Sequence, residues 1–248
     1  MPEPGSAATD DRLLDGRIVL RQPATGYRAA IDPVLLAAAV PNTRGTVLEL
    51  GCGAGAAALC LAWRVPECRV VGLELQPGLA ALARDNAAAS GLAARVEILA
   101  GDLCDPPPAL AAGSFDGVMV NPPYFEAGAH TPPPDGGKAL AHQEGNAALA
   151  AWTAAATRYL RPKGWLTMIH RVDRLIELCA RLWPDYGAIE IVPLWPKPGR
   201  PARRVVVRAR KAVGNPAVLL PGLVLHEADG RFTAAADAIL RDGAPLAL

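Results

Sequence analysis

The 248-residue sequence predicts an α/β fold with a mostly parallel sheet and an antiparallel pair of strands at one edge. Three observations support this prediction. Short apolar runs alternate with longer segments of helical periodicity from residue 46 to residue 183, which is typical of β-α-β units with helices on both faces of a sheet. A glycine-rich segment follows the first apolar run. After residue 185, two apolar runs are joined by a short, proline-rich connection.

The alternating part of the chain predicts five strands with helices between them. The strands are expected at residues 46–50, 69–74, 95–99, 115–120 and 165–170. The helices are expected at residues 55–64, 77–90, 146–160 and 172–183. Proline in the first turn of the second helix and Gly91 just after its end are typical of helix boundaries.

The remaining segments are expected to be simpler. Residues 188–194 and 204–209 are strand-like, and the connection between them, 195–201, is too short and proline-rich for a crossover helix. The two strands should therefore be antiparallel. Residues 1–20 suggest a polar lead-in, and residues 128–137 suggest a loop rich in proline and glycine.

Composition excludes several classes of protein. With 51% hydrophobic and 20% charged residues the chain should fold rather than remain disordered. No apolar run is long enough for a membrane span, and the N-terminal residues lack the pattern of a signal peptide. The five cysteines are scattered without a C-x-x-C pair, so we expect reduced thiols, no metal site and a cytoplasmic protein.

A glycine-rich turn connects the first expected strand to the first helix, with the sequence ELGCGAG at Glu49–Gly55. Glycines allow a tight turn and close approach of a ligand, while the N–H groups of the helix start face the ligand's polar end. Gly51, Gly53 and Ala56 also match G-x-G-x-x-G/A. The motif alone therefore leaves open a nicotinamide dinucleotide and S-adenosylmethionine.

Two acids end the next two strands. Glu74 ends the second strand, where a carboxylate can accept both ribose hydroxyls of an adenosine. Asp102 follows the third strand and could accept the amine of the adenine ring. The alternative for each is a solvated carboxylate at a strand end.

The tetrapeptide Asn121-Pro122-Pro123-Tyr124 follows the fourth strand, at the sheet edge where open α/β sheets bind ligands. By the resemblance of this tetrapeptide to the motif of amino-methyltransferases, the Asn121 side-chain oxygen and the Pro122 carbonyl would accept hydrogen bonds from a planar amine and hold its nitrogen about 3 Å from a methyl group. Tyr124 can stack on a flipped base, a contact worth about 1–3 kcal/mol.

With this tetrapeptide the sequence resembles the amino-methyltransferases of the class I S-adenosylmethionine-dependent superfamily, whose [N/D]PP[Y/F/W] motif follows the fourth strand. The resemblance implies a Rossmann-like class I methyltransferase fold, S-adenosylmethionine as cofactor, and a catalytic role for Asn121, Pro122, Pro123 and Tyr124. The candidate cofactor contacts are Asp32, Glu49, Gly51, Cys52, Gly53, Gly55, Glu74, Leu75, Asp102, Leu103 and Asn121.

Two flanking segments narrow the resemblance. Arg28–Leu36 and Leu223–Thr233 are similar to segments of bacterial tRNA (adenine-N6)-methyltransferases, which modify the adenine next to the anticodon of a valine tRNA. Ala30-Ile31 stands where a Gly-Thr pair is usual, and Phe232 replaces a tyrosine. By this resemblance Asp32 contacts the methionine end of the cofactor, although a helix N-cap is an open alternative.

The same resemblance implies one methyltransferase domain over residues 1–248. Within it we distinguish an N-terminal lead-in at 1–45, a cofactor-binding core at 46–185, and antiparallel edge strands with a C-terminal segment at 186–248.

Charge is unevenly distributed along the chain. Residues 1–130 hold 9 Lys or Arg against 14 Asp or Glu, whereas residues 131–248 hold 16 against 10. Seven basic residues and no acid lie within 197–211, which on an edge hairpin could follow a phosphate backbone. The candidate RNA contacts are Lys197, Arg200, Arg203 and Arg204. The alternative is an edge strand kept monomeric by charge, and Lys138 and His142 are more typical of a solvated loop.

The sequence thus predicts N6-methylation of an adenine in RNA, most simply tRNA, in the cytoplasm. One alternative is methylation of a protein glutamine amide, for which the tetrapeptide serves equally well; such enzymes usually carry an N-terminal helical domain, for which the residues before the first strand leave no room. A non-catalytic RNA-binding protein and a dinucleotide oxidoreductase are further alternatives, but neither explains the Asn-Pro-Pro-Tyr tetrapeptide.

Overall fold

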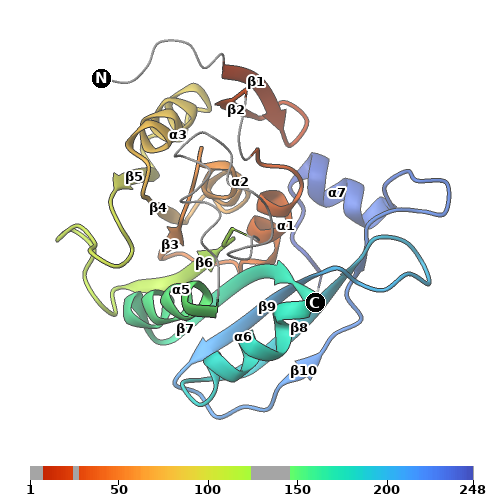
Figure 1. Ribbon diagram of the computed structural model, residues 1–248. Helices are drawn as coiled ribbons and strands as arrows, with labels where there is room; N and C mark the ends of the chain where they lie inside the picture. Colours follow the sequence, from red (N-terminus) through yellow and green to blue (C-terminus); the bar gives the residue numbers. More distant parts are fainter. Residues whose placement is uncertain (1–7, 25–27, 124–145, 248) are drawn as a thin grey trace, which may run out of the picture.

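A mixed β-sheet with helices on both faces forms the centre of the computed structural model, which describes residues 8–24, 28–123 and 146–247 (Figure 1). The strands run in the order β10-β8-β9-β7-β6-β3-β4-β5, and β11 also pairs with β8. Strands β5, β4, β3, β6 and β7 are parallel, and β9 is antiparallel to both β7 and β8. The predicted mostly parallel sheet is confirmed.

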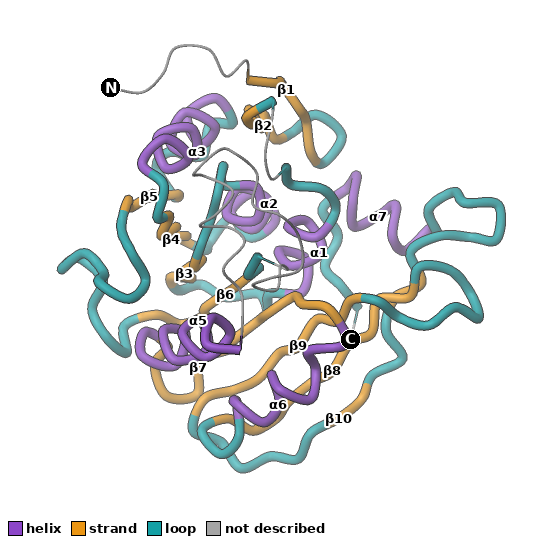
Figure 2. Tube along the Cα trace, in the orientation of Figure 1, coloured by secondary structure: helices purple, strands orange, loops and turns teal. Residues whose placement is uncertain are grey.

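The strands are β1 (Ala8–Leu13), β2 (Ile18–Pro23), β3 (Thr46–Leu50), β4 (Arg69–Glu74), β5 (Val96–Ala100), β6 (Phe115–Val120), β7 (Leu160–Arg171), β8 (Tyr186–Trp195), β9 (Arg204–Lys211), β10 (Val218–Leu219) and β11 (Leu223–Val224). The helices are α1 (Asp32–Ala39), α2 (Ala56–Arg64), α3 (Pro77–Ala89), α5 (Asn146–Tyr159), α6 (Leu175–Leu182) and α7 (Ala234–Asp242), with a 3₁₀ turn at Val172–Arg174. Figure 2 shows the helices lying over the two faces of the sheet.

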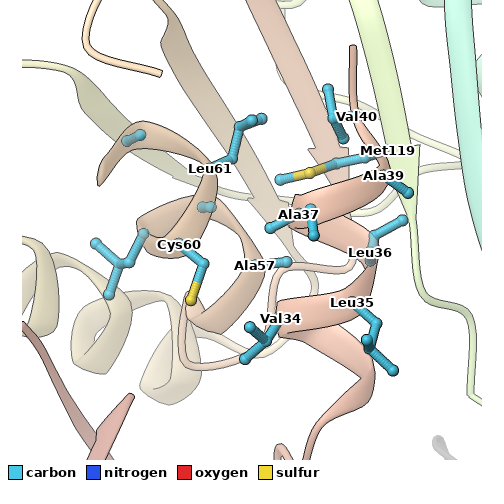
Figure 3. Packing of buried hydrophobic residues seen from close by; sticks show 14 of the residues in the cluster. Val34, Leu35, Leu36, Ala37, Ala39, Val40, Ala57, Cys60, Leu61 and Met119 are labelled. Carbon is cyan, nitrogen blue, oxygen red and sulfur yellow. The ribbon is translucent and has the colours of Figure 1, made fainter. Parts of the chain in front are cut away.

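Each face of the sheet has its own buried core, because successive side chains of a strand point to opposite faces. On β6, Met119 joins the core under α1, α2, α3 and α7, while Val118 and Val120 join the core under α5 and α6. Figure 3 shows the first of these cores where α1 packs on α2: Ala37 and Ala57 are small enough for close approach, and Met119 lies above them in this view. The carboxyl ends of the parallel strands, which we call the carboxyl edge of the sheet, lie between the two helical layers.

The N-terminal lead-in contains structure that the sequence analysis did not predict. Strands β1 and β2 form an antiparallel hairpin, turned by Leu14, Asp15 and Gly16, all with positive φ. On β2, Ile18 and Leu20 are buried and point toward the body of the domain. The expectation of a polar lead-in over residues 1–20 is therefore wrong for its described part. The sequence did not predict the hairpin because β1 is polar and β2 shows only a short alternation of apolar and polar residues.

The predicted antiparallel pairing of residues 188–194 with 204–209 is confirmed, although the pair lies differently from the expectation. Strand β9 is inside the sheet, between β7 and β8, and β10 and β11 cover the outer side of β8. The basic residues of β9 therefore do not lie on an edge strand. The predicted loop at 128–137, with Lys138 and His142, lies outside the described residues. None of the described helices is long and apolar enough to cross a membrane.

Candidate active site

The turn after β3 is shaped by three glycines with positive φ, at Gly51, Gly53 and Gly55. The amides of Gly51 and Cys52 donate to the carbonyl of Leu73 on β4, at 2.8 and 3.0 Å. A Cβ added at Gly53 would meet no atom within 4 Å, so the turn faces open space there. No side chain caps the start of α2, whose N-cap is Gly55. The turn thus exposes backbone at Gly53, where a ligand could approach closely.

Glu74 fixes this turn to the end of β4. Its Oε2 accepts a hydrogen bond from the Gly53 amide at 2.8 Å, and its Oε1 accepts one from the Gln76 amide at 2.9 Å. The residue is only 6% exposed. Because each carboxylate oxygen can accept a second hydrogen bond, Glu74 can also accept the hydroxyls of a ribose lying against the turn.

Glu49 and Cys52 lie beneath the turn and are both buried. Burial raises the pKa of the Glu49 carboxyl well above its ordinary value, against the effect of a backbone hydrogen bond from Ala58, and the nearby Glu74 raises it further. Burial likewise raises the pKa of the Cys52 thiol. Both groups are therefore favoured in their neutral forms, and Cys52 is a packing residue rather than a nucleophile.

Leu75 and Asp102 lie at the ends of β4 and β5. The Leu75 side chain is 46% exposed, an apolar surface next to Glu74 on which an adenine ring could pack. Asp102 is exposed, and its Oδ1 accepts from the Cys104 amide at 2.8 Å, which holds the carboxylate in a local turn. Leu103, the residue after Asp102, is half-buried and packs against the core under α5 and α6.

The Asn-Pro-Pro segment lies beside the glycine turn. In the parallel ladder of β3 and β6, Leu50 is level with Val120, so Gly51 and Asn121 begin adjacent turns about 4.8 Å apart, one strand spacing. Pro122 is buried, and Asn121 and Pro123 are half-buried. Tyr124, the fourth residue of the motif, lies outside the described residues.

Asp32 and Arg204 form an ion pair that the sequence did not suggest. Asp32 is the first residue of α1, so it is not the N-cap, which is Ile31. Its side chain is 7% exposed, and its Oδ2 lies 2.9 Å from Nε of Arg204. A predicted cofactor contact and a predicted RNA contact are therefore joined to each other at the carboxyl edge of the sheet.

The other basic candidates divide into exposed and engaged side chains. Arg200 and Arg203 are exposed on the connection between β8 and β9. Lys197 donates from Nζ to the carbonyl of Ala228 at 3.1 Å. Farther along β9, Arg208 pairs with Glu190 at 2.8 Å. The run of basic residues therefore contributes only part of its charge to the surface.

Two residues of the site were missed from the sequence. Asn86 of α3 is fully buried and donates from Nδ2 to the carbonyls of Ala54 and Arg21, both at 3.0 Å. Trp152 of α5 packs over the glycine turn, since a Cβ at Gly51 would lie 2.7 Å from its Cη2. The only signal for Asn86 was an asparagine within an alanine-rich helix. Nothing in the sequence indicated that Trp152 contacts Gly51, because the two residues lie about 100 positions apart.

Strand order and glycine turn together fit the class I methyltransferase fold. The chain matches the model of a methyltransferase domain over residues 47–144. A tRNA1(Val) (adenine(37)-N6)-methyltransferase of Aeromonas hydrophila is 32% identical over 209 residues, covering 83% of this chain and 85% of that protein. The chain belongs to this family of tRNA1(Val) (adenine(37)-N6)-methyltransferases, and S-adenosylmethionine is the cofactor of the class.

Other relatives match this chain with different identity and over different shares of its length. The enzyme of the same description from Porphyromonas gingivalis (strain ATCC 33277) is 36% identical over 169 residues, and the alignment covers 65% of this chain and 66% of that protein, just under two thirds. A release factor glutamine methyltransferase of Geobacter sulfurreducens is 37% identical, but over only 48% of this chain and 43% of that protein. Among solved structures, a predicted O-methyltransferase of Agrobacterium tumefaciens has a TM-score of 0.72 and 26% identity, covering 88% of this chain and 99% of that one.

Proposed function

We propose that this protein transfers a methyl group from S-adenosylmethionine to N6 of an adenine in tRNA, the adenine(37) that the relatives' description gives. The observation that carries the proposal is the adjacency of Asn121-Pro122 to the Gly51 turn on neighbouring parallel strands. An amine held by Asn121 and Pro122 would meet a methyl group held over the Gly51 turn. The relatives that match most of the chain supply the substrate class.

The glycine turn and the ends of β4 and β5 would hold the cofactor. Glu74 would accept the ribose hydroxyls, Leu75 would pack on one face of the adenine ring, and Asp102 would accept the ring's amine. The N-terminus of α2 and the open space at Gly53 suit the polar methionine end. When bound, S-adenosylmethionine supplies an electrophilic methyl group on a positively charged sulfur.

Asn121 and Pro122 would orient the target amine. The adenine amine is a poor nucleophile because its lone pair is delocalised into the ring. Two acceptors, the Asn121 side-chain oxygen and the Pro122 carbonyl, favour the more pyramidal geometry of the transition state and aim the lone pair at the methyl group. The proline rings fix the backbone so that the carbonyl keeps this direction. Tyr124 would stack on the base.

The substrate side of the proposal concerns the basic connection after β8. Arg200 and Arg203, both exposed, and Lys197 would lie along the phosphates of the RNA. Arg204 would contribute mainly through its ion pair with Asp32. With tRNA as substrate, the protein would act in the cytoplasm, and residues 1–248 would work as a single methyltransferase domain.

Labelled S-adenosylmethionine tests this function directly. The protein is incubated with total RNA or total protein from cells that lack it, and we expect label in the tRNA fraction at N6 of one adenine. Asn121→Ala should abolish the transfer while S-adenosylmethionine binding, measured by calorimetry, stays nearly unchanged. Label in the protein fraction would support the glutamine alternative, and label in neither would leave an RNA-binding protein. Equal loss of binding and turnover in Asn121→Ala would contradict the role of Asn121.

A further inference from the structure

Two loops lie together beyond the carboxyl end of β8, beside α7 (Figure 1). The first is the connection 196–203 between β8 and β9. The second is the segment 225–233 between β11 and α7. The amides of Leu225 and His226 donate to the carbonyls of Trp195 and Pro196, at 2.8 and 3.2 Å. Lys197 reaches the carbonyl of Ala228 at 3.1 Å. The two loops therefore form one surface.

The second loop is a small, fixed hairpin that presents two stacked rings. His226 and Phe232 are antiparallel partners, and their rings stack with centroids 4.7 Å apart and planes inclined by 24°. Glu227 donates its amide to the carbonyl of Arg231 at 2.8 Å. Thr233 closes the hairpin and caps α7 by accepting from the Ala236 amide at 3.2 Å. Both ring positions are thus set by the backbone rather than by a core.

The surface around the rings is basic. Phe232 is 38% exposed, so the stack ends in solvent. The adjoining connection carries Lys197, Arg200 and Arg203 and no acid. The hairpin itself carries two acids, Glu227 and Asp229, and one cation, Arg231, which lies 2.7 Å from Asp229. The two loops together therefore hold four basic residues against two acids. An exposed aromatic face beside cations fits a planar group attached to phosphate, which is the chemistry of a nucleotide in a single strand.

We propose that the His226–Phe232 stack binds a nucleobase of the RNA substrate other than the target adenine, while Arg200 and Arg203 bind the neighbouring phosphates. This inference rests on the proposed function, which makes the substrate an RNA. Strands β6, β7, β9 and β8 are successive neighbours, so the stack lies at the same sheet edge as Asn121, at least three strand spacings, or about 14 Å, away. The bound base therefore belongs to a nucleotide a few positions from the target.

Phe232→Ala tests the stack, with a full-length unmodified valine tRNA as the probe. We expect the Kd for tRNA to rise about 5- to 150-fold, because one base–aromatic stack contributes about 1–3 kcal/mol. Phe232→Tyr should restore binding. Leu219→Ala removes another exposed apolar side chain, on β10 and 72% exposed, and should leave the Kd unchanged. S-adenosylmethionine binding and thermal unfolding report whether each variant remains folded.

Two further measurements separate the parts of the proposal. Replacing single bases of an anticodon-loop RNA by 2-aminopurine should reveal one position, not the target, whose fluorescence is quenched by wild type but not by Phe232→Ala. Arg200→Ala with Arg203→Ala should lower the salt slope of binding by about 1.4, at about 0.7 for each phosphate contact on a single strand. If wild type methylates tRNA while Phe232→Ala binds it equally well, the stack is refuted and the proposed function stands. If wild type neither methylates nor binds tRNA, both are refuted.

Discussion

At the scale of single residues, Gly51 shows why the turn cannot carry a side chain. Its φ of +68° is left-handed, and a Cβ there would meet the Trp152 ring at 2.7 Å. Backbone strain and a clash therefore act at the same position, whereas Gly53 has only the first. Trp152 thus fixes one wall of the turn from the opposite layer of the domain.

Gly51→Ala is expected to lower the free energy of unfolding by about 2–4 kcal/mol and to abolish S-adenosylmethionine binding. About 1–2 kcal/mol of this comes from the left-handed backbone and the rest from the clash. In a Trp152→Ala background the additional cost should fall to the backbone part alone, as urea unfolding of the four variants would show. Gly78→Ala is the control, since a Cβ there meets no atom within 4 Å. An equal cost in both backgrounds would mean that Trp152 does not contact Gly51.

At the scale of elements, two side chains of α3 and its C-cap bind the N-terminal hairpin, and one of them also reaches the glycine turn. Asn86 of α3 accepts from the Arg21 amide at 2.9 Å and donates to the carbonyls of Arg21 and Ala54. It therefore joins β2, α3 and the glycine turn. Ser90 adds a second link by accepting from the Val19 amide at 3.0 Å.

Asn86→Ala should lower the free energy of unfolding by about 2–4 kcal/mol, because it leaves buried backbone groups of β2 and of the turn without their partner. Hydrogen exchange should become faster at Val19 and Arg21 of β2 and unchanged in β7. Asp85→Ala, one residue earlier and exposed, is the matched control and should have little effect. Unchanged exchange in β2 would show that the hairpin is held by its apolar contacts instead.

The elements also show where sequence reasoning succeeds. Strands β3, β4 and β6 are apolar runs bounded by turn residues, so their limits follow within a residue from the pattern. The hairpin β1–β2 was not predicted because its buried side is largely one short strand. Helix α7 was not predicted because its buried face consists only of Ala236 and Ile239. In the candidate site, the glycines and acids could be predicted because they directly follow strands in the sequence. Asn86 and Trp152 could not, since their roles depend on contacts between layers.

At the scale of the whole molecule, the total of basic residues hides two different roles. Arg208 of β9 is paired with Glu190 and lies over the Trp165 ring, with its guanidinium carbon 4.7 Å from the ring centre. Lys211 donates to the carbonyls of Thr157 and Leu160, at 2.5 and 2.6 Å. These cations contact groups within the domain, while Arg200 and Arg203 on the 196–203 connection are exposed. Because both kinds lie within one short segment, 197–211, charge counting alone could not separate them.

The stability of the whole fold should depend on pH through His170. This side chain on β7 is 2% exposed, and its Nδ1 accepts from the Arg171 amide at 2.7 Å. Burial, helped by Arg174 and Arg171 and opposed by Asp173 and Glu177, lowers its pKa to about 4. Between about pH 6.5 and pH 4 the unfolded chain therefore binds a proton that the folded protein does not, and stability falls as the pH falls.

The expected loss from His170 alone approaches about 3 kcal/mol at pH 4, since each pKa unit corresponds to about 1.4 kcal/mol. Urea unfolding at pH 7.5, 6 and 5 would measure it. His170→Gln should be less stable at pH 7.5 but should show a flatter dependence on pH over this range. Met168→Ala, also fully buried on β7, should lower the free energy of unfolding equally at every pH. A slope that is the same in wild type and His170→Gln would assign the acid sensitivity to other groups, because only the removal of a titrating side chain changes the number of protons taken up on unfolding.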